Sequence, residues 1–279
     1  MKPMSQRGEA NARCSNHGHP YYVAGKAMGV VDTASALEQA VSALNSLDPL
    51  PDLAVITGDL VESGEVEEYD HLRTLVAPLH MPVLAIPGNH DAREPMREAF
   101  VADGYLPRRG FLNYVIEDHA LRIVALDTLV PGAPGGALCE ERLLWVDRML
   151  AAATDRPTLL LMHHPPFVTG VGQMDQYGLS SRAAFAEIIL RHSQIERILC
   201  GHLHRAIESR FAGTIAGTAP STAHQLVLDF RPEAPLRFAL EPPGYQLHYW
   251  REGMSLVTHT AAIGDWAGPY RFRKKTPTN

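Results

Sequence analysis

Four short motifs of carboxylate, amide and imidazole side chains suggest a site for two metal ions. They are Gly58-Asp59, the Pro-Gly-Asn-His-Asp segment at 87–91, His163-His164, and the Gly-His-Leu-His segment at 201–204. Two divalent cations about 4 Å apart need one short carboxylate that bridges them and several neutral ligands, with a further histidine for the substrate. Each motif alone is weak, because a Gly-Asp pair is usually an ordinary turn. Their combination and order predict a dinuclear metal site.

The residue types suit separate tasks at such a site. Asp59 has two oxygens and can touch both cations, whereas Asn89 offers an oxygen without adding charge. The alternating spacing of His202 and His204 would place both imidazoles on one side of an extended segment, where each can serve a different metal. Water bound by the two ions loses a proton near neutral pH and becomes a nucleophile. The sequence thus predicts hydrolysis.

Alternating helical and strand patterns place these motifs. Apolar spacing predicts helices at 34–47, 65–79, 140–153 and 181–192, and apolar runs predict strands at 53–57, 82–86, 158–162 and 197–200, with 114–116 and 122–126 as a pair. Each motif follows a strand. Such alternation predicts a largely parallel α/β sheet whose ligands gather beyond the carboxyl ends of the strands. Further on, hairpin strands are expected at 207–211, 225–230, 236–240, 246–251 and 255–260.

Composition limits the classes of function. The 279 residues carry a net charge of −6, which argues against a general nucleic-acid binder. Three cysteines make a disulfide framework improbable and favour a reducing compartment. The sequence has no apolar stretch of about 20 residues and no apolar segment typical of a secretory signal near its start, so we expect a cytoplasmic protein without membrane contact. Seven histidines outside the ligand set are expected mostly on surfaces: His71, His80, His119, His164, His192, His248 and His259.

Across nearly its whole length the chain resembles the calcineurin-like metallophosphoesterases, in the branch of class III cyclic nucleotide phosphodiesterases and bacterial glycerophosphodiesterases. The resemblance rests on residues 29–33, 57–59, 68–69, 87–91, 162–166, 201–204, 222–225 and 266–269. It implies a four-layer αββα sandwich with the site at the rim of two stacked sheets. We expect a core domain over residues 1–220. A β-rich segment over 221–279 should complete the sandwich, and in relatives this segment often helps to form dimers.

The resemblance also implies residue roles. Asp59 would bridge the metals, Asn89, His163 and His202 would complete the second metal site, and His204, His19 and His17 would form the first. Manganese, iron or zinc would occupy them. His90 would contact the phosphate and protonate the leaving alkoxide. His224 would be a further phosphate contact. Apart from the resemblance, the carboxylates of Glu62, Asp91 and Asp127 are candidates for fixing imidazole tautomers.

The beginning of the chain departs from the family pattern. Family members have an apolar strand that runs into Ser-Asp-x-His, whereas residues 12–19 here read Ala-Arg-Cys-Ser-Asn-His-Gly-His after a polar segment that would make a poor central strand. The family aspartate thus corresponds to His17. Three explanations remain open: a neutral imidazole ligand at the first metal, a weak or absent first metal, or a misread start.

The predicted function is metal-dependent hydrolysis of a small phosphodiester, either a 3′,5′-cyclic nucleotide or a glycerophosphodiester. A phosphomonoesterase is the nearest alternative, and the acidic balance disfavours a nuclease. A different class is a degenerate binding or scaffold protein that has kept the fold and lost one metal. Loops such as 168–179 and the C-terminal β segment would build the substrate pocket.

Overall fold

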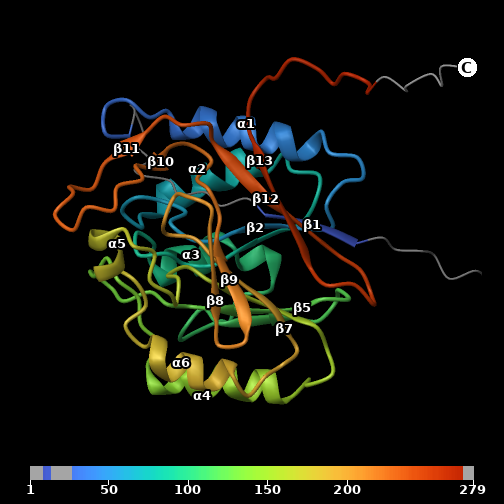
Figure 1. Ribbon diagram of the computed structural model, residues 1–279, viewed down its shortest axis with the longest axis vertical. Coiled ribbons are helices and arrows are strands. Elements are labelled where there is room, and N and C mark those ends of the chain that lie inside the picture. The colour runs from blue at the N-terminus through green and yellow to red at the C-terminus, as the bar shows by residue number, and fades with distance from the viewer. Residues whose placement is uncertain (1–8, 14–26, 273–279) are drawn as a thin grey trace, which may run out of the picture.

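Two stacked sheets between two helical layers form the protein (Figure 1), so the predicted αββα sandwich is confirmed. The computed structural model describes residues 9–13, by their backbone, and residues 27–272. The helices are α1 Thr33–Asn45, α2 Val66–Val76, α3 Arg93–Ala99, α4 Glu140–Ala151, α5 Gly172–Gln176 and α6 Arg182–Ile189, with a 3₁₀ turn at Val101–Asp103. None of the helices in these described ranges is long and apolar enough to cross a bilayer.

One layer is a mixed sheet of six strands. Its members are β4 Tyr114–Ile116, β5 Arg122–Leu126, β6 Thr158–Met162, β7 Ile195–Cys200, β8 Ile207–Phe211 and β9 Thr214–Thr218. They lie in the order β4–β5–β6–β7–β9–β8, with β5, β6, β7 and β9 parallel and the two edge strands antiparallel to their neighbours. The sequence pattern missed β9, whose residues Thr214–Thr218 include a glycine and two threonines and show no apolar run.

The other layer consists of shorter strand groups. They are the parallel pair β2 Ala54–Ile56 and β3 Val83–Ala85, and the antiparallel group β1 Glu9–Arg13, β12 Gly244–Trp250 and β13 Val257–Ala262. A separate small hairpin joins β10 Gln225–Leu226 to β11 Phe238–Ala239. The C-terminal strands β12 and β13 thus form one sheet with β1 in this layer. The expected boundary at residue 220 and the expected role of residues 221–279 in completing the sandwich stay predictions.

The polar N-terminal segment, expected to make a poor central strand, forms a strand at the edge of the β1–β12–β13 group. Residues Glu9–Arg13 pair with β12 in a continuous register from Glu9 opposite Trp250 to Arg13 opposite Gln246, and they also lie against β2. The backbone hydrogen bonds of a strand come from its neighbour and do not require apolar side chains. A partner more than 230 residues away in the chain thus overrides the local composition.

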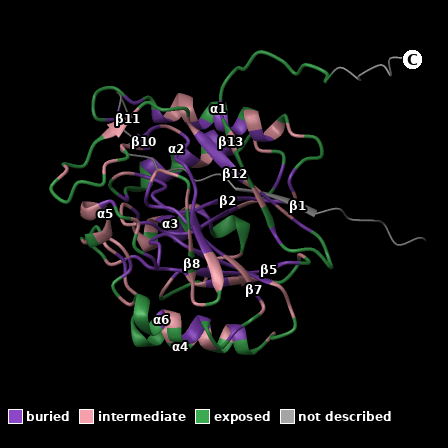
Figure 2. Ribbon diagram, in the orientation of Figure 1, coloured by how far each residue is buried: buried purple, intermediate pink, exposed green. Residues whose placement is uncertain are grey.

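Side chains on alternate faces of the strands pack the two sheets together. In β6, Leu159 and Leu161 face the other sheet, where they meet Val55 and Leu84, and Leu160 and Met162 face the helices α4 and α6. Both faces of these strands are buried (Figure 2), which is why their sequences are continuous apolar runs. The loops at the strand ends are consequently mounted on a rigid double layer.

Leu161 should be a stability determinant of this inter-sheet core. It is fully buried, so Leu161→Ala should lower the free energy of unfolding by about 2–5 kcal/mol through lost transfer energy and a cavity. Urea denaturation measures this change. Leu190→Ala, at a side chain that is 66% exposed beside α6, is the control and should change it by less than about 0.5 kcal/mol. Equal effects of the two substitutions would contradict the assigned core.

Candidate metal centre

Six of the predicted site residues lie in loops at the carboxyl ends of four strands. Asp59 follows β2, Asn89 and His90 follow β3, His163 follows β6, and His202 and His204 follow β7. Two of these strands belong to each sheet, so the site forms where the edges of the sheets meet, as expected for parallel strands. The other two predicted ligands, His17 and His19, lie outside the described residues.

Four potential ligand atoms converge at the centre of this site. The Nε2 atom of His163 lies 3.2 Å from Asp59 Oδ2, 3.2 Å from Asn89 Oδ1 and 3.2 Å from His202 Nδ1. Ligands bound at about 2.1 Å to one ion are about 3.0 Å apart in octahedral geometry and about 3.4 Å apart in tetrahedral geometry. The three separations measured from His163 Nε2 therefore lie in the range expected between ligands of one cation.

The contact of His163 with Thr57 directs its Nε2 toward the other ligand atoms. Its Nδ1 lies 2.7 Å from the carbonyl oxygen of Thr57 and can donate to it, which places the lone pair on Nε2, toward the other ligands. A metal-binding histidine commonly donates its second ring N–H to a carbonyl in this way. Burial lowers the pKa of His163, but the neighbouring Asp59 outweighs this effect and raises it.

The imidazole of His202, next to His163, is kept neutral by its surroundings. Burial and the neighbouring His163 lower the pKa of His202 to about 3. A neutral imidazole is the form that binds a metal. One carboxylate, one amide and two imidazoles with lone pairs directed inward thus suit a divalent ion of intermediate softness.

His164 lies among these ligands but has other partners. Its Nδ1 is 2.8 Å from the hydroxyl of Thr128 and its Nε2 is 3.3 Å from the carbonyl oxygen of Pro134. Its ring also packs 4.8 Å from that of His163 and 4.7 Å from that of His202. Although the three histidines are close enough to form a metal triad, both nitrogens of His164 are occupied by protein groups, so we assign it to packing behind the ligands.

The expected surface positions of several histidines were wrong. His164 and His248 are buried, and His192 is buried while its Nε2 lies 2.8 Å from Asp147 Oδ1. A histidine gives no periodic signal by itself, so its sequence alone does not reveal burial. His71, His80 and His259 are exposed as expected, and His119 is partly buried.

The ring of His90 is held by Glu62 at the edge of the cavity. Its Nδ1 lies 3.1 Å from Glu62 Oε2, while its backbone N–H donates to Asp59 Oδ1 at 3.1 Å. Burial lowers the pKa of His90, but the hydrogen bond to Glu62 and the charges of Asp59 and Glu62 raise it to about 9. Cations bound at Asp59 would offset that carboxylate's effect. Of the three carboxylates considered for orienting an imidazole, Glu62 contacts one.

The other two carboxylates hold backbone and arginine groups. Asp91 accepts from the backbone N–H of Gly88 at 2.7 Å and from the hydroxyl of Tyr69 at 2.9 Å. Burial and nearby Asp59 raise its pKa to about 7. Asp127 binds the guanidinium of Arg93 at 2.6 Å. Both therefore support the loops around the site.

Backbone geometry at the site favours particular residues. Asp59, His202 and His204 have φ values of 52°, 72° and 48°, in the left-handed region that side chains usually avoid. A Cβ at Gly58 would overlap His163 and one at Gly88 would overlap Asp59. The two glycines thus permit the close approach of the ligand loops, and the strained residues are held there by the surrounding fold.

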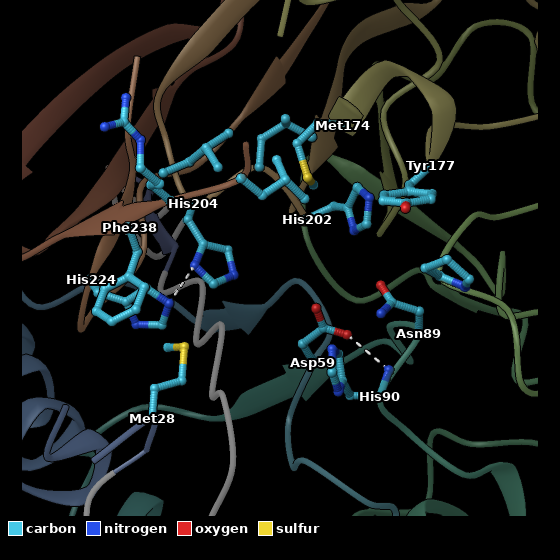
Figure 3. Close-up of a pocket in the computed structure, with 15 residues that line it drawn as sticks. Met28, Asp59, Asn89, His90, Met174, Tyr177, His202, His204, His224 and Phe238 are labelled. Atoms are coloured by element: carbon cyan, nitrogen blue, oxygen red, sulfur yellow. Dashed lines mark hydrogen bonds between the residues drawn. The ribbon is translucent and has the colours of Figure 1, made fainter. Parts of the chain in front are cut away.

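His204 lies against His224 in the same cavity (Figure 3). The Nδ1 of His204 is 3.1 Å from the Nε2 of His224, and both residues line a hollow of about 300 Å³ that Asp59, Asn89 and His90 also line. The structure thus brings the predicted first-metal ligand His204 and the predicted phosphate contact His224 together. Their roles stay predictions.

Sequence reasoning missed part of this cavity. Met174 and Tyr177 reach it from the segment at α5, and Phe238 reaches it from the β10–β11 hairpin. A helix of five residues and strands of two residues give too little periodicity to detect. The expected loop at 168–179 does contribute to the pocket, but it contains this short helix.

Two known proteins with similar sequences are both named as phosphodiesterases. The probable glycerophosphodiester phosphodiesterase GpdQ of Arcobacter nitrofigilis is 40% identical over 243 residues, covering 87% of this chain and 89% of the relative. The 3′,5′-cyclic adenosine monophosphate phosphodiesterase CpdA of Escherichia coli K12 is 30% identical over 238 residues, covering 84% and 83%.

Two solved structures share the fold at low sequence identity. A dimetal phosphatase from Danio rerio has a TM-score of 0.62 at 12% identity, with 92% of this chain and 99% of that chain covered. A purple acid phosphatase, PPD1, from yellow lupin has a TM-score of 0.69 at 13% identity, with 93% of this chain and 52% of that chain covered.

The sequence model of the calcineurin-like phosphoesterase family matches residues 19–206 of this chain. This match runs through all four motifs whose side chains meet around His163, and the relatives extend the likeness over most of the chain. The family predicted from those motifs is therefore confirmed: this chain belongs to the calcineurin-like phosphoesterase family.

Proposed function

We propose that this protein is a metal-dependent hydrolase of small phosphodiesters, with a 3′,5′-cyclic nucleotide or a glycerophosphodiester as substrate. The observation that carries this proposal is the convergence of Asp59, Asn89 and His202 on Nε2 of His163 at 3.2 Å each. One curated relative is named for glycerophosphodiesters and another for a cyclic nucleotide. Their names support a phosphodiester substrate without selecting the group esterified to the phosphate.

The cavity supports a small substrate. Its volume of about 300 Å³ lies at the lower end of the range for small-molecule sites. The net charge of −6 gives no general attraction for a polyanion, so recognition of one phosphate would be local. These two properties together favour a compact diester over a nucleic acid.

Asp59, Asn89, His163 and His202 would hold one divalent ion, and Asp59 and His204 would hold a second together with His17 and His19. Such ions supply Lewis-acid stabilisation of phosphoryl oxygens and a lowered pKa of water. His90, on the loop beside Asp59, would donate to the phosphate and carry the proton for the leaving alkoxide. His224, buried beside His204, would contact the phosphate from the other side.

A binding or scaffold protein is the second candidate, favoured by one feature of the sequence. His17 stands where the family has an aspartate, so the first metal would lose a negatively charged ligand. Metal affinity depends strongly on the number of charged ligands. We therefore propose that the first site binds its ion more weakly than the second site.

Asp59→Asn should abolish most of the activity. Asparagine keeps the size of the side chain and tolerates the left-handed backbone at this position, but it loses the charge that would bridge two cations. We expect turnover of bis(p-nitrophenyl) phosphate with added Mn²⁺ or Zn²⁺ to fall on the order of 10³-fold. Metal content, measured by plasma mass spectrometry, should fall with it. Asp70→Asn on the exposed face of α2 is the matched control, and full activity of Asp59→Asn would refute the bridging role.

His17→Asp should strengthen the weaker metal site. The added carboxylate should lower the dissociation constant of the second metal equivalent by roughly tenfold or more, measured by titration of metal-free protein with Mn²⁺. His71→Asp, at an exposed histidine of α2, controls for the general effect of charge. An unchanged titration would contradict a site limited by His17. If the wild-type protein binds at most one equivalent of metal and does not hydrolyse the diester, it is a binding or scaffold protein and not an enzyme.

A further inference from the structure

The side chains that line the candidate catalytic cavity are of two chemical kinds (Figure 3). Asp59, Asn89 and the histidines are polar. The others, which the proposed chemistry does not use, are mostly apolar: Met174 and Tyr177 lie near His202 and Asn89, and the β10–β11 hairpin contributes Leu226, Leu236 and Phe238, the last beside His224. A hydroxyl-rich ester group would find few hydrogen-bond partners among these side chains.

Hydrogen bonds fix the β10–β11 hairpin to the metal-ligand loop. The N–H of Leu226 donates to the carbonyl oxygen of His204 at 3.4 Å, and Leu226 stands opposite Phe238 in the hairpin register. Arg205, the residue after His204, donates from its side chain to the carbonyl oxygen of Leu226 at 2.9 Å and forms an ion pair with Glu241 at 2.6 Å. The position of the hairpin relative to the site is therefore set by His204 and Arg205.

The segment at α5 closes the opposite wall. Asp175 accepts hydrogen bonds from the backbone N–H groups of Thr169 at 2.7 Å and Gly170 at 2.9 Å, which fixes the start of this short helix. Gln173 Oε1 accepts from the N–H of Leu236 at 3.3 Å and thereby joins α5 to the hairpin. Met174 and Phe238 consequently belong to one connected frame around the cavity.

Phe238 lies where the apolar side chains of the hairpin meet the histidines. Its ring packs edge to face on His224, with centroids 5.1 Å apart and an interplanar angle of 67°, and His224 in turn packs 4.7 Å from His204. Phe238 is only half-buried and lines the cavity. Arg237, the charged neighbour at the rim, has its guanidinium bound to Asp229 at 2.9 Å. A ring placed beside the phosphate would therefore meet the aromatic surface of Phe238.

We infer that the apolar hairpin side chains Leu226, Leu236 and Phe238 form a subsite for an aromatic ester group, the class that includes the base of a cyclic nucleotide, and that Phe238 is its specificity-determining residue. This inference rests on the proposed function, since the phosphate must lie at the metal ligands. Stacking on an aromatic side chain tolerates different rings, because each ring has a π face. A glycerophosphodiester, which lacks a ring, would leave this surface uncovered.

The test compares two substrates in wild-type protein and three variants loaded with Mn²⁺. Phe238→Ala should raise KM for cyclic AMP about tenfold, the loss expected for one stacked base, and should change KM for glycerophosphoethanolamine less than twofold. Phe238→Tyr, which keeps the ring, should behave like the wild type toward both. Phe230→Ala, on the same hairpin but 62% exposed and outside the cavity lining, is the matched control and should also leave both unchanged.

Equilibrium binding of adenosine 5′-monophosphate, measured by calorimetry, separates this inference from the proposed function. A protein without phosphodiesterase activity whose affinity for the nucleotide falls about tenfold in Phe238→Ala would overturn the function and retain the subsite. Equal effects of Phe238→Ala on both diesters, or a wild type that prefers glycerophosphoethanolamine, would overturn the subsite and retain the function. Absence of both turnover and nucleotide binding would overturn both.

Discussion

The arrangement of the site depends on one buried imidazole that joins the two sheets. His163 follows a strand of the six-stranded sheet, and its Nδ1 lies 2.7 Å from the carbonyl oxygen of Thr57, which follows β2 in the other sheet. This contact directs Nε2 toward ligand atoms that come from both layers. The candidate metal centre therefore forms only when the two sheets pack together. Gly58 allows this close approach, because a Cβ at that position would overlap His163.

Electrostatics around that imidazole favour an external cation. His202 and His164 are kept neutral by burial, whereas Asp59 raises the pKa of His163 and the buried carboxyl of Asp91 is pushed to a pKa of about 7. Buried ionisable groups of this kind are costly unless a countercharge is supplied. A divalent ion among Asp59, Asn89, His163 and His202 would supply that charge and would be bound by their oxygen and nitrogen atoms.

The cavity combines parts of different origin. Loops of the rigid double sheet provide most of its polar side chains, and such loops can hold reacting groups in fixed positions. The short segment at α5 and the β10–β11 hairpin provide apolar side chains on different sides of it, and a few named hydrogen bonds hold these two segments in place. Because these attached segments contact the region where the ester group would lie, changes in them can alter substrate preference without disturbing the metal ligands.

The sequence by itself determined the family, the α/β class and the four ligand motifs, because each motif directly follows an apolar run and strand ends converge in such sheets. It also indicated Asp59, Asn89, His163 and His202 as one ligand set. Tertiary structure alone decided the rest. The polar segment Glu9–Arg13 becomes a strand because of β12, and His164 is buried because Thr128 and Pro134 bind both of its nitrogens. Met174 and Phe238 meet across one cavity although they lie 64 residues apart, in elements too short to show periodicity. Contacts between distant segments leave no local pattern, and only the folded chain specifies them.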